Sequence, residues 1–190
     1  MANTTEPPLS DASEPNWIIR PERPEDAPLV DALNETAFGP GRFAKSAYRL
    51  REGVSHLEAL SFVAIEARKL KGSVRFWPVA IGGHKVLMLG PLAVEAAQRG
   101  RGIGVALMER GLDEARAGGY DAVILVGDEP YYARVGFSKL QPGRVTLPGP
   151  VDPSRVLGLS LKPGAALNLS GKVRRATLDE NVCADGAELG

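Results

Sequence analysis

The sequence predicts a single domain of mixed α/β (α+β) class, with a central, twisted, mostly antiparallel sheet flanked by helices. Three apolar segments follow one another across short glycine-containing turns, as in an antiparallel meander. A segment with helical spacing of apolar residues, 102–117, then separates the strand candidates 86–94 and 121–126. This order implies a right-handed crossover with local parallel pairing, so the sheet is mixed. A chain of 190 residues is long enough for one such domain.

The first half of the chain supplies one strand, two helices and the meander. Residues 17–20 form a short apolar run closed by a proline, which cannot continue a ladder, and predict the first strand. Helical spacing over 29–37, after two prolines suited to a first turn, predicts a helix that stops at the glycine-proline break in 38–41. A second helix is predicted over 43–51. The meander strands are predicted at 60–67, 73–81 and 86–94.

The second half supplies the crossover helix and the remaining strands. Two consecutive glycines end the helix 102–117, and the wholly apolar segment 121–126 predicts a buried strand. Asp128 is expected to cap a short helix that ends at Gly136. The last strands are predicted at 144–147 and 156–161.

Both ends of the chain lack these patterns. Residues 1–16 have neither the basic nor the apolar region of a secretory signal and predict a disordered leader. Periodicity disappears over 171–190, which predicts a mobile C-terminal tail. The domain is therefore expected to span residues 17–170.

The composition argues against several classes of protein. Lys plus Arg and Asp plus Glu both number 23, so the basic excess of nucleic-acid or membrane-surface binders is missing. The most apolar stretch, 86–94, is far shorter than the roughly 18 residues of a membrane span. Cys183 is the single cysteine, so a reducing compartment is expected. His56 and His84 have no partners at metal-ligand spacing. We therefore expect a cytoplasmic protein without a metal.

The segment 98–104, between a predicted strand and a predicted helix, is suited to binding an anion. Amide groups at a helix N-terminus have no intrahelical partner, and glycines let a phosphate approach them closely. A P-loop would need a Gly-Lys-Ser/Thr ending, which is absent. A dinucleotide fingerprint would need glycine where Val105 stands. Both common nucleotide interpretations are therefore weakened.

The pattern Arg99-x-x-Gly102-x-Gly104 resembles the coenzyme A loop of the GNAT (Gcn5-related N-acetyltransferase) superfamily. A Gly-Pro-Leu-Ala-Val segment at 90–94 precedes the loop, and Tyr132 followed by Gly-Phe at 136–137 is similar to a later element of that family. The chain resembles the YhbS-like bacterial branch in particular, through the segments 38–53, 90–94 and 125–137. The resemblance covers about residues 17–162.

The resemblance implies the acyl-CoA N-acyltransferase fold of that superfamily, with residues 17–170 as one N-acetyltransferase domain and acetyl-CoA as cosubstrate. Backbone groups of Leu92, Ala93 and Val94 would pair with the pantetheine arm as with an added strand. The pyrophosphate would be cradled by the amides of the loop, which comprises Arg99, Gly100, Arg101, Gly102, Ile103 and Gly104.

The resemblance also places Tyr132 at the sulfur atom, as the catalytic donor to the departing thiolate. A phenol with a pKa near ~10 is protonated at pH 7, whereas a thiol has a pKa near ~8.5. Full proton transfer would be unfavourable by about 2 kcal/mol, so we expect a strong hydrogen bond early and transfer only late. Tyr131 is the less favoured donor, because the spacing to Gly-Phe selects Tyr132.

The acceptor amine must lose a proton before it can attack, and several groups could take it. Candidates by position are Asp128, Glu129, Glu66 and Glu95, and water with backbone carbonyls could replace them all. Asp128 is favoured as a helix cap rather than as a base.

The predicted activity is transfer of the acetyl group to a primary amine, a small molecule or a peptide, by direct attack in a ternary complex. No cysteine lies near the loop to carry the acetyl group. The alternatives are a coenzyme A-binding sensor with little or no catalytic activity and a nucleotide-binding protein. The acceptor is not identified, and a monomer or a homodimer is expected.

The resemblance implies a pocket for the acceptor amine, and two groups of side chains are expected near it. Phe76 and Trp77 alternate on one strand, so one is expected in the core and the other facing the acceptor. Four cations of the second predicted helix are most simply a solvated face, although one arginine could meet a substrate carboxylate. These cations are Arg42, Lys45, Arg49 and Arg51.

Overall fold

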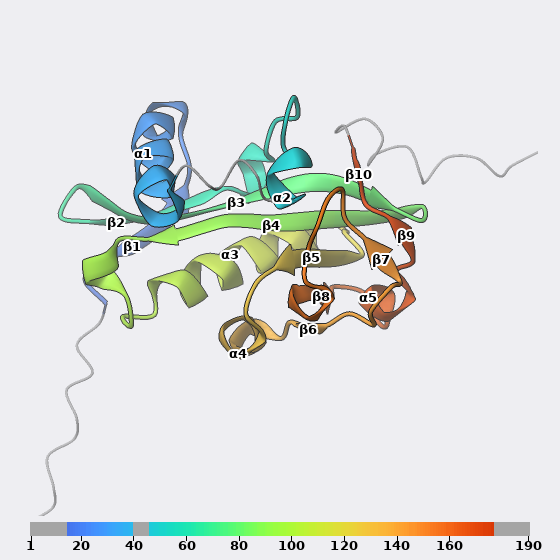
Figure 1. The fold of residues 1–190 in the computed structure, drawn as a ribbon. Coiled ribbons are helices and arrows are strands. Elements are labelled where there is room, and N and C mark those ends of the chain that lie inside the picture. The colour runs from blue at the N-terminus through green and yellow to red at the C-terminus, as the bar shows by residue number, and fades with distance from the viewer. Residues whose placement is uncertain (1–14, 40–45, 177–190) are drawn as a thin grey trace, which may run out of the picture.

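The computed structural model describes residues 15–39 and 46–176, which form helices on both faces of one sheet (Figure 1). The sheet has eight strands, seven of them in the order β1-β2-β3-β4-β5-β8-β6, with β10 paired to β3 beside this path. The strand bounds are β1 Ile18–Pro21, β2 Phe62–Glu66, β3 Lys69–Ile81, β4 His84–Val94, β5 Ala122–Val126, β6 Ser138–Lys139, β8 Val156–Ser160 and β10 Arg174–Arg175.

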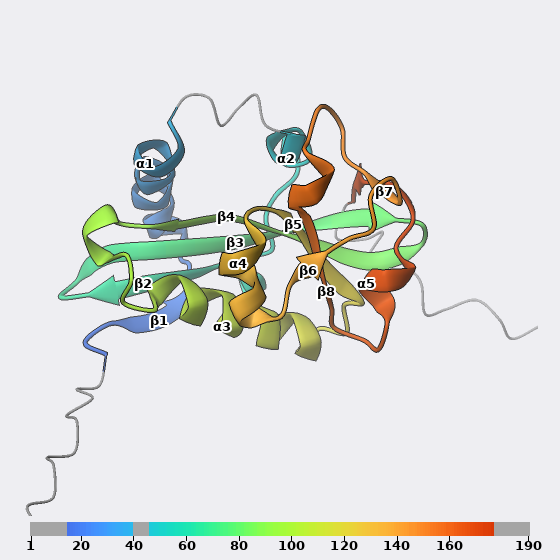
Figure 2. The same ribbon diagram turned by 60° about the horizontal axis from the view of Figure 1, so that its bottom comes forward.

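Two helices lie on one face of the sheet and a long helix lies on the other. Figure 1 shows α1 (Ala27–Phe38) and α2 (Ser46–Arg49) above β3 and β4, and α3 (Ile103–Ala117) below them. Figure 2 shows the lower face, where α3 crosses the sheet and α4 (Glu129–Tyr132) lies near β6. Across residues 15–39 and 46–176, no helix has the length and apolar character to cross a membrane.

The strands divide the apolar residues between two cores, one on each face of the sheet. On β4, Leu87 and Leu89 join the core under α3, while Val86 and Met88 join the core on the opposite face. This alternation follows from the two-residue period of a strand. Other members of the first core are Phe62, Phe76, Ile103, Leu107, Met108 and Leu112, and of the second Leu50, Val79, Ile81, Ala122 and Ile124.

The predicted mixed α/β class is confirmed, and the meander, the crossover helix and β5 lie within a few residues of their predicted positions. The sequence pattern missed β6 and the short helix α5 (Ala165–Asn168). It also missed β9 (Gly171–Lys172), which pairs with β7 (Val145–Thr146), and β10. Both strands fall at the start of the segment expected to be a mobile tail. The rest of that tail and residues 1–14 of the expected leader lie outside the described residues.

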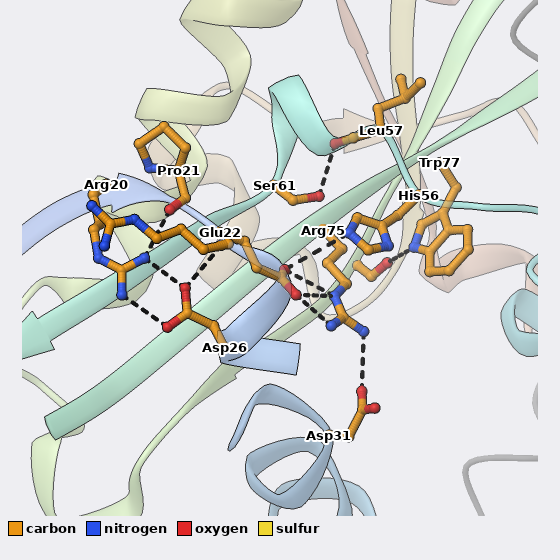
Figure 3. A network of polar contacts seen from close by, with 12 residues as sticks. Arg20, Pro21, Glu22, Asp26, Asp31, His56, Leu57, Ser61, Arg75 and Trp77 are labelled. Atoms are coloured by element: carbon orange, nitrogen blue, oxygen red, sulfur yellow. Dashed lines mark hydrogen bonds and ion pairs between the residues drawn. The ribbon is translucent and has the colours of Figure 1, made fainter. Parts of the chain in front are cut away.

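A buried ionic network fixes the start of α1 to the sheet (Figure 3). Arg75 of β3 donates to the Glu22 carboxylate from Nε at 2.9 Å and from Nη2 at 2.5 Å. Its Nη1 donates to Asp31 of α1 at 3.1 Å. Arg20 of β1 donates to Asp26, next to α1, at 2.5 and 2.8 Å. The Glu22 side chain is only 4% exposed, so its charge depends on Arg75 for compensation.

We predict that Glu22→Gln lowers the free energy of unfolding by about 3 kcal/mol, because it leaves part of the buried Arg75 charge uncompensated. Urea denaturation measures the loss. The matched control is Glu25→Gln, whose ion pair with Arg23 at 3.8 Å is exposed and should contribute at most about 1 kcal/mol. Equal losses in the two variants would contradict the assigned role of the network.

Candidate active site

The sheet opens between β4 and β5. The two strands pair in parallel only from Val86↔Ala122 to Met88↔Ile124, and β4 then continues to Val94 without β5. Beyond this point lies a cleft of about 280 Å³ between β4, the loop before α3, and α4. Its lining comprises Ala37, Phe38, Leu92, Ala93, Val94, Gln98, Arg99, Gly100, Gly102, Ile103, Gly104, Val105, Tyr131, Tyr132 and Arg134.

The amides of residues 102–105 at the start of α3 have no acceptor among the described residues, whereas the Arg99 and Arg101 amides donate to the Ala96 and Gln98 carbonyls at 3.3 and 3.4 Å. The first intrahelical bond runs from the Ala106 amide to the Gly102 carbonyl at 3.0 Å, so the preceding amides have no intrahelical acceptor. No side chain caps this end of the helix. The positive end of the helix dipole adds to the attraction for an anion.

Two glycines give the loop its path. Gly100 and Gly102 have φ values of 84° and 85°, in the left-handed region that side chains other than glycine rarely adopt. A Cβ atom at either position would meet no atom within 4 Å. The glycines are therefore required by the backbone conformation, and the space beside them is open.

The end of β4 offers a free strand edge to the same cleft. Leu92, Ala93 and Val94 pair with β3 on one side. On the other side, none of the described strands pairs with residues 92–94. This edge can accept an extended molecule through backbone hydrogen bonds.

Tyr132 enters the cleft from α4. Its ring lies against Gly127, where a Cβ atom would overlap it, and its centroid is 6.1 Å from that of Phe137. Burial is the main cause that raises the pKa of Tyr132 to about 12. The charges of Tyr131 and Asp128 raise it further by smaller amounts. The hydroxyl group is therefore protonated at neutral pH, as required of a hydrogen-bond donor.

Tyr131, which the sequence indicated as the less favoured donor, and Arg134, for which it indicated no role, also line the cleft. The Tyr131 hydroxyl lies against Gly104, in the place that a Cβ atom would take. The Arg134 guanidinium lies over the Tyr131 ring, 6.0 Å from its centroid. Tyr131 and Arg134 are three residues apart, and residues at this spacing on a helical turn are neighbours. This spacing could have predicted their contact from the sequence.

Of the residues expected to bind the coenzyme, all except Arg101 line the cleft. The Arg101 guanidinium instead pairs with Glu66, with 2.8 Å between Nη2 and Oε1. It also donates to the side-chain oxygens of Asn16 and Gln98. Its side chain is thus already held by groups outside the cleft.

None of the four carboxylates considered as bases lines the cleft, and each is held by a cation. Glu66 pairs with Arg101, whose hydrogen bond lowers the pKa of this carboxyl group. Asp128 pairs with Arg155 at 3.3 Å and does not cap α4 with its side chain, contrary to the expected capping role. The other two pairs are Glu95 with Lys71 at 2.6 Å and Glu129 with Lys139 at 2.9 Å.

On the upper face of β3 and β4, Arg51 lies beside the ring of Trp77. Phe76 is fully buried in the core under α3, whereas Trp77 packs on the opposite face, as expected from their alternation. Trp77 donates to the Gly90 carbonyl at 2.6 Å, and the Arg51 guanidinium lies 5.8 Å from the centroid of its ring. Arg51 is therefore not on a solvated helix face, in contrast to the exposed Arg49. Arg42 and Lys45 lie outside the described residues.

The chain is similar to known acetyltransferases. A family model described as "Acetyltransferase (GNAT) family" matches residues 27–137. The "Uncharacterized N-acetyltransferase YhbS" of Escherichia coli (strain K12) is 38% identical over 123 residues, which cover 63% of this chain and 72% of the relative.

Two crystal structures resemble the whole fold. YhbS from Escherichia coli in complex with CoA has 31% identity and a TM-score of 0.69, over 97% of this chain and 98% of that chain. A GNAT family acetyltransferase from Brucella melitensis in complex with acetyl-CoA has 31% identity and a TM-score of 0.62, over 84% of this chain and 96% of that chain. With its opened sheet, its glycine-containing loop and these likenesses, the chain belongs to the GNAT family of N-acetyltransferases.

Proposed function

We propose that this protein binds acetyl-CoA in the cleft between β4 and α4 and transfers the acetyl group to a primary amine by direct attack. The observation that supports the proposal is that three features lie in the same cleft. These features are the unpaired amides at the start of α3, the free edge of β4 and the protonated Tyr132. The CoA and acetyl-CoA complexes of the two similar structures support the choice of cosubstrate.

The loop and the strand would hold opposite ends of the cosubstrate. The amides of Ile103 and Gly104 lie at the positive end of α3 and suit the pyrophosphate oxygens. Backbone groups of residues 92–94 suit the amides of the pantetheine arm, which can pair as an added strand. Together they direct the thioester toward the earlier part of β4.

In the reaction, the amine nitrogen forms a bond to the acetyl carbon, and the bond between that carbon and sulfur breaks. The sulfur leaves as a thiolate, which the Tyr132 hydroxyl stabilises by donating a hydrogen bond. With a pKa of about 12 for Tyr132 and ~8.5 for a thiol, full proton transfer is unfavourable by about 5 kcal/mol. Tyr132 therefore keeps its proton throughout, in contrast to the late transfer expected from an unperturbed phenol. The thiolate is protonated after its release, because a solvent at pH 7 lies below the thiol pKa of ~8.5.

Water also receives the proton that the amine must lose. An alkyl ammonium group with a pKa of ~10.4 is mostly protonated at pH 7. The carboxylates Asp128, Glu129, Glu66 and Glu95 lie outside the cleft lining and are held in ion pairs. The fraction of free amine, and with it the rate, is then set by the pH of the solvent.

We predict that Gly102→Val weakens the binding of coenzyme A at least about 100-fold, because valine cannot adopt φ near 85° without strain and its side chain would enter the open space beside the loop. Isothermal titration calorimetry measures the affinity.

The matched control is Gly119→Val, at the opposite end of α3. Gly119 has φ of 73° and open space around it, so this variant carries similar strain away from the cleft and should keep its affinity. Unchanged affinity in Gly102→Val, or the same loss in both variants, would exclude the loop as the phosphate site.

We predict that Tyr132→Phe lowers kcat about 100-fold and changes the affinity for acetyl-CoA less than threefold, because only the departing thiolate loses a hydrogen bond. The reaction is measured by the release of free thiol from coenzyme A. In the wild type, kcat/KM should rise with pH as the amine loses its proton, and should show no falling limb near pH ~8.5, since the pKa of Tyr132 is about 12.

Tyr131→Phe serves as the control, since Tyr131 contacts the loop at Gly104 instead. A fall of the wild-type rate above pH ~8.5 would contradict the assignment of Tyr132 as the donor, because the donor would then have a pKa close to that of an ordinary thiol. Tight coenzyme binding without acetylation of any amine in a broad panel would favour the coenzyme-binding sensor.

A further inference from the structure

Arg51 is half-buried, and within residues 15–39 and 46–176 no carboxylate compensates the charge of its guanidinium group. Its Nε atom is buried and has no hydrogen-bond partner. Over residues 15–39 and 46–176, no acidic side chain lies within ion-pair distance of it. By contrast, Arg20, Arg75 and Arg101 each meet a carboxylate at 2.5–2.8 Å. Arg51 therefore differs from the buried and half-buried arginines around it.

Such a group is costly, because burial removes water from a charge without supplying a counter-ion. Burial lowers the pKa of Arg51 to about 10, so the group still carries its charge at neutral pH. Tyr132 lies close enough to interact with it electrostatically, but Tyr132 is itself neutral at that pH. The positive charge thus stays available to a ligand.

Arg51 lies outside the lining of the cleft, but it is close enough to Tyr132, which belongs to that lining, to interact with it electrostatically. Its Nη2 atom is 3.0 Å from the point where a Cβ atom of Gly90 would stand. Gly90 precedes Val94 by four residues on β4, which places it roughly 13 Å from the start of the loop at an extended rise of ~3.3 Å per residue. The pyrophosphate site at α3 is therefore too distant for Arg51 to serve it.

Among the described residues, the charged group that acts on Arg51 is the cation Arg75. Trp77 forms one wall, and its indole nitrogen is fixed to the Gly90 carbonyl. The His56 ring lies 5.6 Å from the Trp77 ring, and burial, followed by the charge of Arg75, holds the pKa of His56 below its usual value. The Arg75 charge is itself met by Glu22 and Asp31. Among the described residues, Arg51 thus lies beside Trp77 and Gly90 without an anion that compensates its charge.

We infer that Arg51 binds an anionic group of the acceptor, a carboxylate or a phosphate, so that the substrate is an amine that carries such a group. The planar guanidinium donates two parallel hydrogen bonds to either anion. Glycine at position 90 leaves the adjoining backbone without a side chain. The inference rests on the proposed acetyl transfer and names the substrate class of that same site.

The test compares matched amines in the thiol-release assay: an amino acid against its carboxamide, and aminoethyl phosphate against ethanolamine. We expect the wild type to prefer at least one of the anionic amines roughly 10- to 100-fold in kcat/KM. The carboxylate and phosphate pairs show which anion is used. Arg51→Met should remove the preference by raising KM for the anionic amine, and Arg51→Lys should restore part of it. The control Arg49→Met, on the exposed end of α2, should keep the full preference.

No preference in the wild type, or a preference that survives Arg51→Met, would overturn the inference while leaving acetyl transfer intact. If no amine is acetylated, acetyl transfer itself fails, and the anion site is then tested without turnover. Calorimetry on the coenzyme-loaded wild type should show that N-acetylglycine binds more tightly than N-acetylglycinamide, or an N-acetylated aminoethyl phosphate more tightly than N-acetylethanolamine. Equal affinities within both pairs would overturn the anion site. If Arg51→Met does not fold, the substrate pairs on the wild type and Arg51→Lys decide the question in the same way.

Discussion

The site depends on backbone amides at the start of α3 that have no partner among residues 15–39 and 46–176. A helix always leaves its first amides without intrahelical acceptors, and here no side chain caps them. The left-handed conformations of Gly100 and Gly102 carry the chain out of η4 (Ala96–Gln98) and into the helix while leaving open space beside the loop. The result is a fixed cluster of donors with the positive end of the helix dipole behind it, which suits a diphosphate.

The opening of the sheet turns this cluster of donors into part of a larger site. If β5 followed β4 along its whole length, the edge at residues 92–94 would be covered and the pantetheine arm would have no strand to join. Pairing instead ends at Met88↔Ile124, after which β5 remains paired with β8. The same opening gives Tyr132 access to the cleft, so that the proposed binding of the cosubstrate and the proposed stabilisation of the thiolate both depend on one structural feature.

Local pattern predicts much of this arrangement, because the relevant residues act close to their own place in the chain. The glycine loop, the apolar strand β5 and the alternation of Phe76 and Trp77 are readable from spacing alone. Arg51 is different: α2 ends at Arg49, so helical spacing no longer orients Arg51, and only tertiary packing brings it against Trp77 and Gly90. The ion pairs that hold Glu66 and Glu95 join residues 35 and 24 positions apart. Strands of two residues, such as β9 and β10, contain too few positions to show a pattern.

The most direct measurement of the central claim is an amide nuclear magnetic resonance titration of the labelled protein with coenzyme A. Hydrogen bonds from α3 to the pyrophosphate should shift the amide signals of Gly102, Ile103, Gly104 and Val105 most strongly, with smaller changes along residues 92–94. The structure also has a separate pocket, whose lining includes Leu140, Pro142 and Val156. If the signals of the loop stay in place while those of this separate pocket move instead, the account would be contradicted.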